Sequence, residues 1–185
     1  WVVLSGSLPR GVSDLFYAEM VARVHDIGHR VALDTSGSAL AAAVEAGPDL
    51  IKPNAEELAE LTGVPLHTWG DVAEQAEKLR ANGVGTVLVS LGEDGALLVD
   101  STGVSRAYAP PVEVRSTVGA GDSTLAGFLA AGAHGTEALR TAVAFGTAAV
   151  TLPGSAMPGP TDVHVDLVVV EEDPDMSRPL KGGVA

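Results

Sequence analysis

Residues 116–128 read Ser-Thr-Val-Gly-Ala-Gly-Asp-Ser-Thr-Leu-Ala-Gly-Phe, a glycine turn placed directly before an apolar, helix-forming segment. The backbone N–H groups of such a turn, with the positive end of the helix that follows, stabilise an anion without any lysine. Asp122 at the junction is placed to accept a proton from a hydroxyl that attacks a phosphoryl group. This stretch predicts phosphoryl transfer, although a tight strand-to-helix connection without a ligand would read the same.

The length and composition are typical of one domain with a substantial core. The chain has 185 residues, of which 46% are hydrophobic and only 4% aromatic. It contains no cysteine, which excludes disulfides, zinc-thiolate sites and thiol catalysis. No apolar run in the sequence is long enough to cross a bilayer. We therefore expect a cytoplasmic protein without a membrane partner.

The charge balance is strongly acidic, with 11 basic against 24 acidic side chains and a net charge of −13. Such a chain is not expected to bind nucleic acid, whose phosphates need a basic surface. The negative net charge also repels anionic substrates. A phosphate ester would therefore need local amides, a few cations and Mg²⁺ in order to bind. General solubility is the simpler explanation of the acidity.

Strands and helices alternate along the chain. The expected strands are 1–4, 30–34, 50–51, 86–90, 96–99 and 104–108, the first of them buried. The expected helices are 13–27, 38–47, one that begins at 53–54, 71–81, 122–132 and 136–150. This alternation predicts an α/β sandwich with a largely parallel sheet.

Polar or glycine-containing loops follow most of the expected strands. They begin at Ser5, Asp34, Lys52, Ser90 and Thr117. Ligands of open α/β sheets bind at the carboxyl ends of the strands. We therefore expect these loops to share one edge of the sheet.

The segment Lys52-Pro53-Asn54-Ala55-Glu56-Glu57 begins a helix. Asn54 and Glu57 are three positions apart, which puts both on one face, where they could hold the water shell of Mg²⁺. The same spacing predicts a capping box, which we favour from the residues alone; both roles can coexist. Lys52 faces either a phosphate or solvent.

Two further loops have the residues of ligand-binding turns. Ser90-Leu-Gly-Glu-Asp-Gly95 lies between two apolar strands, and its glycines would let the backbone approach a nucleotide closely. Ser5-Gly-Ser-Leu-Pro9 has two hydroxyls suited to a sugar or a phosphate. A plain hairpin and a plain strand-to-helix turn would have similar sequences.

Taken in order, these four motifs resemble the PfkB/ribokinase family of sugar kinases over nearly the whole chain. The resemblance implies a ribokinase-like three-layer α/β/α sandwich with a mostly parallel sheet, as one domain over 1–185 with 166–185 as a tail. Ser5-Gly-Ser-Leu-Pro, Asp34-Thr-Ser-Gly and Lys52-Pro-Asn resemble the phosphosugar branch. Residues 144–154 most resemble members that use fructose 1-phosphate, with tagatose 6-phosphate and fructose 6-phosphate as alternatives.

The resemblance assigns the chemistry of transfer to the glycine turn. Asp122 becomes the base that deprotonates the sugar hydroxyl. The backbone of Gly119, Ala120 and Gly121 becomes the anion hole for the γ-phosphoryl group. Ser7 becomes a contact of the phosphosugar.

ATP as co-substrate is implied in the same way. Ser90, Gly92 and Gly95 match the family's nucleotide loop, and Lys52 is a candidate for the nucleotide phosphates. Val143 and Thr147, on the last helix, are candidates for the adenine pocket.

Asn54 and Glu57 match the family's Asn-x-x-Glu element, which organises Mg²⁺. Ser116 stands where many members carry an Asp of a monovalent-cation site, which argues against potassium activation. The apolar opening at Trp1 leads us to expect a further amino-terminal part. In the family that part supplies the lid and often the dimer contact.

We therefore expect a homodimer at full length, and little or no activity from these 185 residues alone. A nucleotide-binding module without catalysis is a second hypothesis, and retention of Asp122 argues against a degenerate family member. A third hypothesis is a structural domain whose glycine turns bind no ligand. It would require that all four motifs match the family by coincidence.

Overall fold

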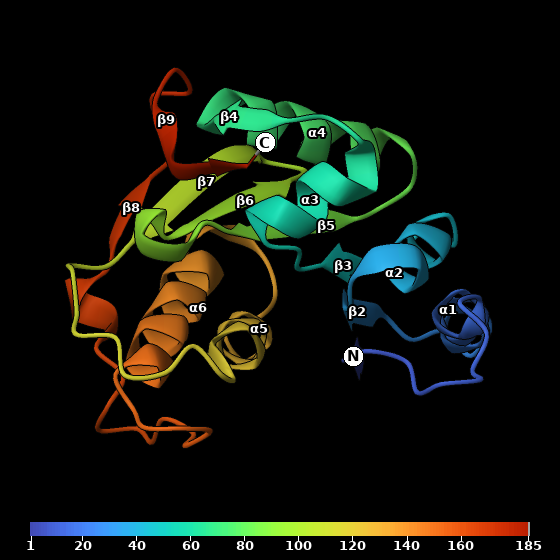
Figure 1. The fold of residues 1–185 in the computed structure, drawn as a ribbon, viewed down its shortest axis with the longest axis horizontal. Helices are drawn as coiled ribbons and strands as arrows, with labels where there is room; N and C mark the ends of the chain where they lie inside the picture. Colours follow the sequence, from blue (N-terminus) through green and yellow to red (C-terminus); the bar gives the residue numbers. More distant parts are fainter. Residues whose placement is uncertain (185) are drawn as a thin grey trace. The chain divides into compact units, whose positions relative to one another are not determined.

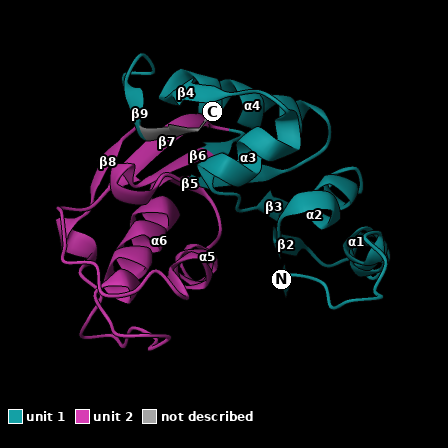
Figure 2. Ribbon diagram, in the orientation of Figure 1, with its two compact units in different colours: residues 1–89, 99–101, 175–185 teal, residues 90–98, 102–174 magenta. Residues whose placement is uncertain are grey.

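The computed structural model describes residues 1–184, and the larger of its two sheets has seven strands (Figure 1). The chain divides into two compact units (Figure 2). Unit 1 comprises residues 1–89, 99–101 and 175–185, and unit 2 comprises 90–98 and 102–174.

Unit 1 is built on parallel strands with helices between them. Its elements are β1 (Val2–Ser5), α1 (Phe16–Asp26), β2 (Val31–Asp34), α2 (Gly37–Val44), β3 (Leu50–Ile51), α3 (Ala55–Thr62), β4 (Leu66–Thr68), α4 (Trp69–Ala81), β5 (Thr86–Ser90) and β9 (Pro179–Val184). The strands β1, β2, β3 and β5 pair in parallel, in that order. The predicted mostly parallel sheet with helices is confirmed.

The strand β1 was expected to be buried, and this is wrong. Val3 is 47% exposed, whereas Val2 and Leu4 pack against Val21 and Val24 of α1. Among the described strands β1 pairs only with β2, at the end of the sheet order. Because side chains alternate across a strand, only one of its faces meets the core.

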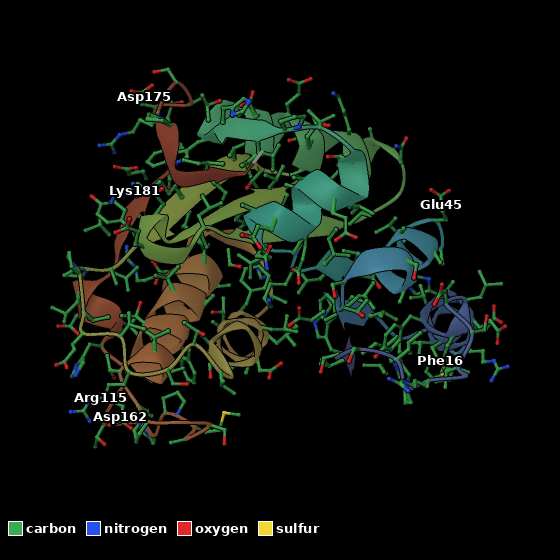
Figure 3. The ribbon with its side chains drawn as sticks, in the orientation of Figure 1. Phe16, Glu45, Arg115, Asp162, Asp175 and Lys181 are labelled. Carbon is green, nitrogen blue, oxygen red and sulfur yellow. The ribbon has the colours of Figure 1, made fainter. Side chains whose placement is uncertain are left out.

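Two helices of unit 1 begin at other residues than expected. The helix α1 starts at Phe16, which is exposed (Figure 3), and not at Ser13, whose Oγ accepts a hydrogen bond from the Leu15 N–H at 3.2 Å. The helix α4 starts at Trp69 through a capping box of Thr68 and Asp71. The N–H groups of His67 and Thr68 donate to the Asp71 carboxylate and lower its pKa.

Unit 2 contains the paired helices that follow the glycine turn. Its elements are the 3₁₀ turn η1 (Gly92–Asp94), β6 (Ala96–Asp100, shared with unit 1), β7 (Gly103–Tyr108), α5 (Ala120–Ala130), α6 (Gly135–Val150), η2 (Val165–Leu167) and β8 (Val169–Glu171). The strand β8 pairs antiparallel with β7, and the seven-stranded sheet has the order β1-β2-β3-β5-β6-β7-β8. The segment expected as a tail, 166–185, thus contributes β8 and β9. Within the described residues, no helix is both long and apolar enough to span a membrane.

The helices α5 and α6 pack closely because glycines face their partners. A Cβ atom at Gly146 would lie 2.3 Å from Thr124 Oγ1, and one at Gly127 would lie 3.0 Å from the Phe145 side chain. These distances leave no room for a methyl group. The position of α5, which carries Asp122, therefore depends on small residues at its contact with α6.

We expect Gly146→Ala to lower the free energy of unfolding by about 1–3 kcal/mol, because the added methyl group overpacks the contact. Urea unfolding of the two proteins measures the difference. Gly159→Ala is the control, since a Cβ there makes only an ordinary 3.5 Å contact with Asp162. A second change, Thr124→Ala, should restore part of the loss; equal stability of all the proteins would contradict the packing argument.

Candidate functional site

The carboxyl ends of β1, β2 and β3 lie side by side in unit 1. Ser5 is paired with Asp34 in the register, and the Gly6 N–H donates to the Asp34 carbonyl at 2.9 Å. The Tyr17 hydroxyl lies 3.0 Å from the Ser5 carbonyl and 2.9 Å from that of Gly6. The prediction of a shared edge is confirmed for the loops at Ser5, Asp34 and Lys52. Ser7 is exposed in the first of these loops.

Lys52 is buried at this edge and forms an ion pair with Asp34. The Lys52 Nζ lies 3.1 Å from Asp34 Oδ1, and the two side chains are 6% and 16% exposed. The alternative in which Lys52 faces solvent is therefore wrong. Asp34 is not expected as the partner of Lys52 from the residues around either position. The sequence signal for this pair is that Asp34 ends β2 and Lys52 directly follows β3, the parallel neighbour of β2.

Asn54 and Glu57 form the capping box at the start of α3. The Glu57 N–H donates to Asn54 Oδ1 and the Asn54 N–H donates to Glu57 Oε2, both at 2.8 Å. The capping box that the spacing of Asn54 and Glu57 predicts is confirmed. The geometry also holds the amide and the carboxylate on one face of the helix start.

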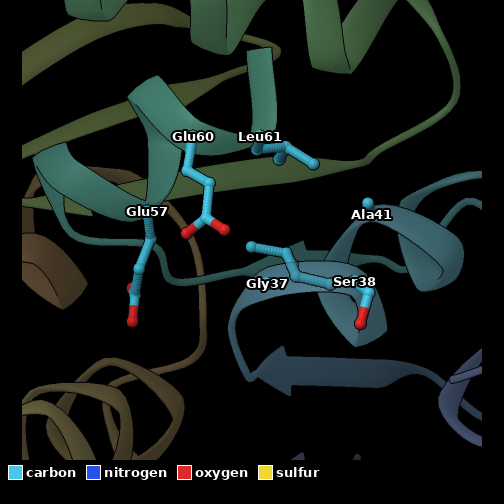
Figure 4. A pocket seen from close by; sticks show the side chains of 7 residues that line it. Gly37, Ser38, Ala41, Glu57, Glu60 and Leu61 are labelled. Atoms are coloured by element: carbon cyan, nitrogen blue, oxygen red, sulfur yellow. The ribbon is translucent and has the colours of Figure 1, made fainter. Parts of the chain in front are cut away.

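A pocket of about 150 Å³ opens beside this helix (Figure 4). Its lining residues come from α2 and α3: Gly37, Ser38, Leu40, Ala41, Glu57, Glu60 and Leu61. Figure 4 shows Glu57 and Glu60 projecting from α3, and Ser38 from α2.

The donors at the start of α3 fit Mg²⁺ that keeps much of its water. Carboxylate and amide oxygens are the ligands that this ion prefers, and it commonly binds through one or two carboxylates plus waters. No group of three or more His, Cys, Asp or Glu side chains arranged to hold a metal occurs in the described part of the chain. Asn54 and Glu57 thus suit contact through water rather than a complete protein cage.

Replacing Asn54 by alanine should lower the free energy of unfolding by about 0.5–2 kcal/mol, because the N-cap acceptor of α3 is lost. Asn54→Asp keeps an acceptor there and should stay close to the unaltered chain. Thermal or urea unfolding measures both changes. A loss that is equal in the two variants would mean that the cap does not stabilise α3.

The glycine turn of unit 2 leads directly into α5. Gly119 has φ +79° and is the N-cap, and the Ser123 N–H donates to its carbonyl at 2.9 Å. Gly121 and Asp122 lie in the first turn, where helix N–H groups have no carbonyl within the helix. Asp122 is exposed there. A carboxylate thus lies in the first turn of α5, which begins at Ala120 instead of Asp122. The Ala120 N–H donates to the Thr117 carbonyl at 3.3 Å, and the anion hole expected at Gly119–Gly121 stays a prediction.

Met157 lies against this turn and was not expected there. Its Sδ is 3.9 Å from Ser123 Oγ, and its Cε is 3.5 Å from where a Cβ of Gly119 would stand. Its side chain is 63% exposed. The proline-rich segment around Met157 contains no periodic pattern that could have predicted this contact.

The predicted nucleotide residues of unit 2 have different surroundings. Ser90 is the last residue of β5 and the first of unit 2. Gly92 is exposed, with open space where a Cβ would stand. Gly95 has φ +88°, and a Cβ there would lie 2.0 Å from the Ala107 carbonyl oxygen. Gly95 is therefore required by the hairpin itself. On α6, Val143 is buried and Thr147 is half-buried.

Comparison with known proteins agrees with these motifs. The family model described as pfkB family carbohydrate kinase matches residues 1–162. The chain is 44% identical over 163 residues to the 1-phosphofructokinase of Rhodobacter capsulatus, covering 86% of this chain and 52% of that protein. It is 42% identical over 177 residues to the 1-phosphofructokinase of Haloferax volcanii, covering 91% and 57%. The chain thus spans about half the length of the curated relatives it matches.

Solved structures show the same fold. Phosphofructokinase-2 from Escherichia coli in complex with potassium has a TM-score of 0.81 and 38% identity, over 86% of this chain and 53% of that one. A possible 1-phosphofructokinase from Thermotoga maritima has a TM-score of 0.80 and 27% identity, over 91% and 56%. The predicted ribokinase-like α/β fold is confirmed.

Proposed function

Since this chain belongs to the PfkB family of carbohydrate kinases, we propose that it serves ATP-dependent phosphoryl transfer to a phosphosugar, most specifically fructose 1-phosphate. The product would be fructose 1,6-bisphosphate. The observation that carries the proposal is the exposed Asp122 in the first turn of α5, directly after the Gly119 turn. The curated relatives named 1-phosphofructokinase support the choice of acceptor.

In the proposed reaction, Asp122 accepts the proton of the sugar C6 hydroxyl. The hydroxyl oxygen forms a bond to the γ-phosphorus of ATP, and the bond from that phosphorus to the bridging oxygen breaks. The electron pair of the broken bond leaves with ADP. N–H groups of the Gly119–Gly121 turn stabilise the negative charge on the transferring group, as donors fixed in advance do in many enzymes.

The residues of unit 1 serve binding in this proposal. Asn54 and Glu57 would hold Mg²⁺ through its water shell, and the ion would neutralise phosphate charge. Lys52 supplies a cation for a phosphate, and Ser7 contacts the phosphosugar. A potassium requirement is not proposed, because Ser116 contributes a hydroxyl, which accepts from the Val118 N–H at 3.2 Å, and no carboxylate.

In the second unit, the turn at Ser90, Gly92 and Gly95 holds the nucleotide in this proposal. Val143 and Thr147 on α6 belong to the adenine pocket. At full length we propose a homodimer.

Fructose 6-phosphate and tagatose 6-phosphate are alternative acceptors of the same chemistry. The structure of Escherichia coli phosphofructokinase-2 in complex with fructose-6-phosphate, 37% identical to this chain, is the observation that favours the first of them. The alternative outside the enzymes is a module that binds a nucleotide without transferring its phosphoryl group.

Phosphorus NMR tests the proposal. We would incubate Mg-ATP and fructose 1-phosphate with the chain, and with the chain joined to the part of the Rhodobacter capsulatus relative that it does not match. The incubations are repeated with fructose 6-phosphate and with tagatose 6-phosphate. The expected result is a new C6 phosphate ester from the joined protein, with ADP formed in equal amount. Mg-ATP binding without any phosphate ester from any of the three sugars would favour the non-catalytic module.

A further inference from the structure

Arg106 is a buried arginine on β7 for which the reaction described above has no use. It is 5% exposed. Burying a guanidinium is costly unless its N–H groups and its charge find partners. The partners of the Arg106 guanidinium therefore show which parts of the chain this side chain holds in place.

The guanidinium of Arg106 joins the turn at 92–95 to β8. Its Nε and Nη2 donate to the Asp94 carbonyl oxygen at 3.1 and 2.9 Å. Its Nη1 lies 3.1 Å from Glu171 Oε2, and β7 and β8 pair Arg106 with Glu171 in their register. The guanidinium carbon lies 4.2 Å from the ring centre of Tyr108. Such a planar fork is fixed in orientation by its partners, unlike a lysine ammonium.

The turn that receives these bonds is held on two sides. The Leu91 N–H donates to the Gly95 carbonyl at 2.8 Å and closes the turn on itself. A Cβ at Gly95 would lie 2.0 Å from the carbonyl oxygen of Ala107, which is the residue after Arg106. By contrast, Gly92 is exposed and has open space above its Cα. The turn is therefore fixed at Gly95 and open at Gly92.

We infer that Arg106, anchored by Glu171, is a positioning residue that holds the 90–95 turn in the conformation that binds the nucleotide. The inference rests on the proposed function, which assigns this turn to ATP. Arg106 itself is buried behind the turn and acts through the Asp94 carbonyl. A turn that moves by even a fraction of an ångström presents its N–H groups at wrong angles to a phosphate or ribose.

The test is the dissociation constant of Mg-ATP, measured by calorimetry on the 185-residue chain and on Arg106→Lys. The lysine keeps the charge but loses the two parallel N–H bonds to Asp94. We expect binding to weaken about tenfold, the scale of one lost hydrogen bond to a charged group. Glu171→Gln should give a smaller change in the same direction. Amide hydrogen exchange of Leu91 and Gly95 should accelerate in both variants.

Arg80→Lys is the matched control. Arg80 Nε also donates to a backbone carbonyl, that of Gly85 at 3.0 Å, and Arg80 Nη1 pairs with Glu77 at 3.0 Å. This control should bind Mg-ATP like the unaltered chain. Faster exchange at the turn with an unchanged dissociation constant in Arg106→Lys would overturn the inference alone. Absence of Mg-ATP binding by the unaltered chain would overturn the proposed function together with the inference.

Discussion

Replacing Asp122 by asparagine is expected to lower the rate of sugar-dependent ADP release by about 10²–10⁴-fold, the usual contribution of a positioned general base. Asparagine has nearly the same shape but accepts no proton at neutral pH. Mg-ATP binding should remain close to that of the unaltered protein, because the turn ahead of α5 is unchanged. A coupled ADP assay measures the rate, and calorimetry measures the binding.

Asp122 also has a structural role that the experiment must separate from catalysis. A carboxylate in the first turn of a helix stabilises it by about 0.3–1 kcal/mol. Glu137 in the first turn of α6 is a matched control, because it is an exposed carboxylate at an equivalent place. Glu137→Gln should leave the rate of ADP release unchanged. Similar losses of rate in the two variants would argue against Asp122 as the base.

The second large effect is expected at the buried ion pair. Asp34→Ala should lower the free energy of unfolding by about 3–5 kcal/mol, because it leaves the ammonium of Lys52 buried without its carboxylate. The Lys52 side chain is 6% exposed in the structure. Urea unfolding measures the change, and a marginal protein would lose much of its stability.

The double variant Asp34→Ala with Lys52→Met isolates the cost of the unpaired charge. We expect it to be more stable than Asp34→Ala alone, because the second change removes the buried ammonium. Glu19→Ala breaks the exposed pair of Glu19 with Arg23 and should cost at most about 1 kcal/mol. A double variant that is no more stable than the single one would contradict the argument from burial.

The elements with strong local signals could be predicted from the sequence. The helix at 120–130 follows Gly119, and the helix at 135–150 begins at Gly135. Both are rich in small aliphatic residues, and the structure places them within about two residues of the expectation. The strands at 86–90 and 96–100 are apolar runs bounded by glycine turns. Periodicity and glycine suffice where an element and its ends are marked in its own residues.

The elements that depend on distant partners were missed. The strands β4 and β9 pair across more than 100 residues of chain. The strand β4 has only three residues, and β9 contains a proline and two glycines, which are uncommon within strands. The start of α4 at Trp69 follows from a capping box with Asp71 at its third position, a weaker sequence signal than Glu.

The candidate site likewise contains local features that the sequence predicts and long-range contacts that it does not. The capping box of Asn54 and Glu57 was predicted because its two residues are three positions apart. The bond from Arg106 to Glu171 joins residues 65 positions apart, and that from Ser123 to Met157 joins residues 34 apart. No local pattern encodes such contacts, because they depend on how strands and helices pack.

The acceptor preference of the joined protein tests the central claim most directly. We would measure kcat/KM for ADP release with fructose 1-phosphate, fructose 6-phosphate and tagatose 6-phosphate, at fixed Mg-ATP. The account predicts a clear preference for fructose 1-phosphate, and loss of that turnover in Asp122→Asn. A preference for another phosphosugar would keep the chemistry but refute the proposed acceptor. Turnover that is unaffected by Asp122→Asn would contradict the account itself.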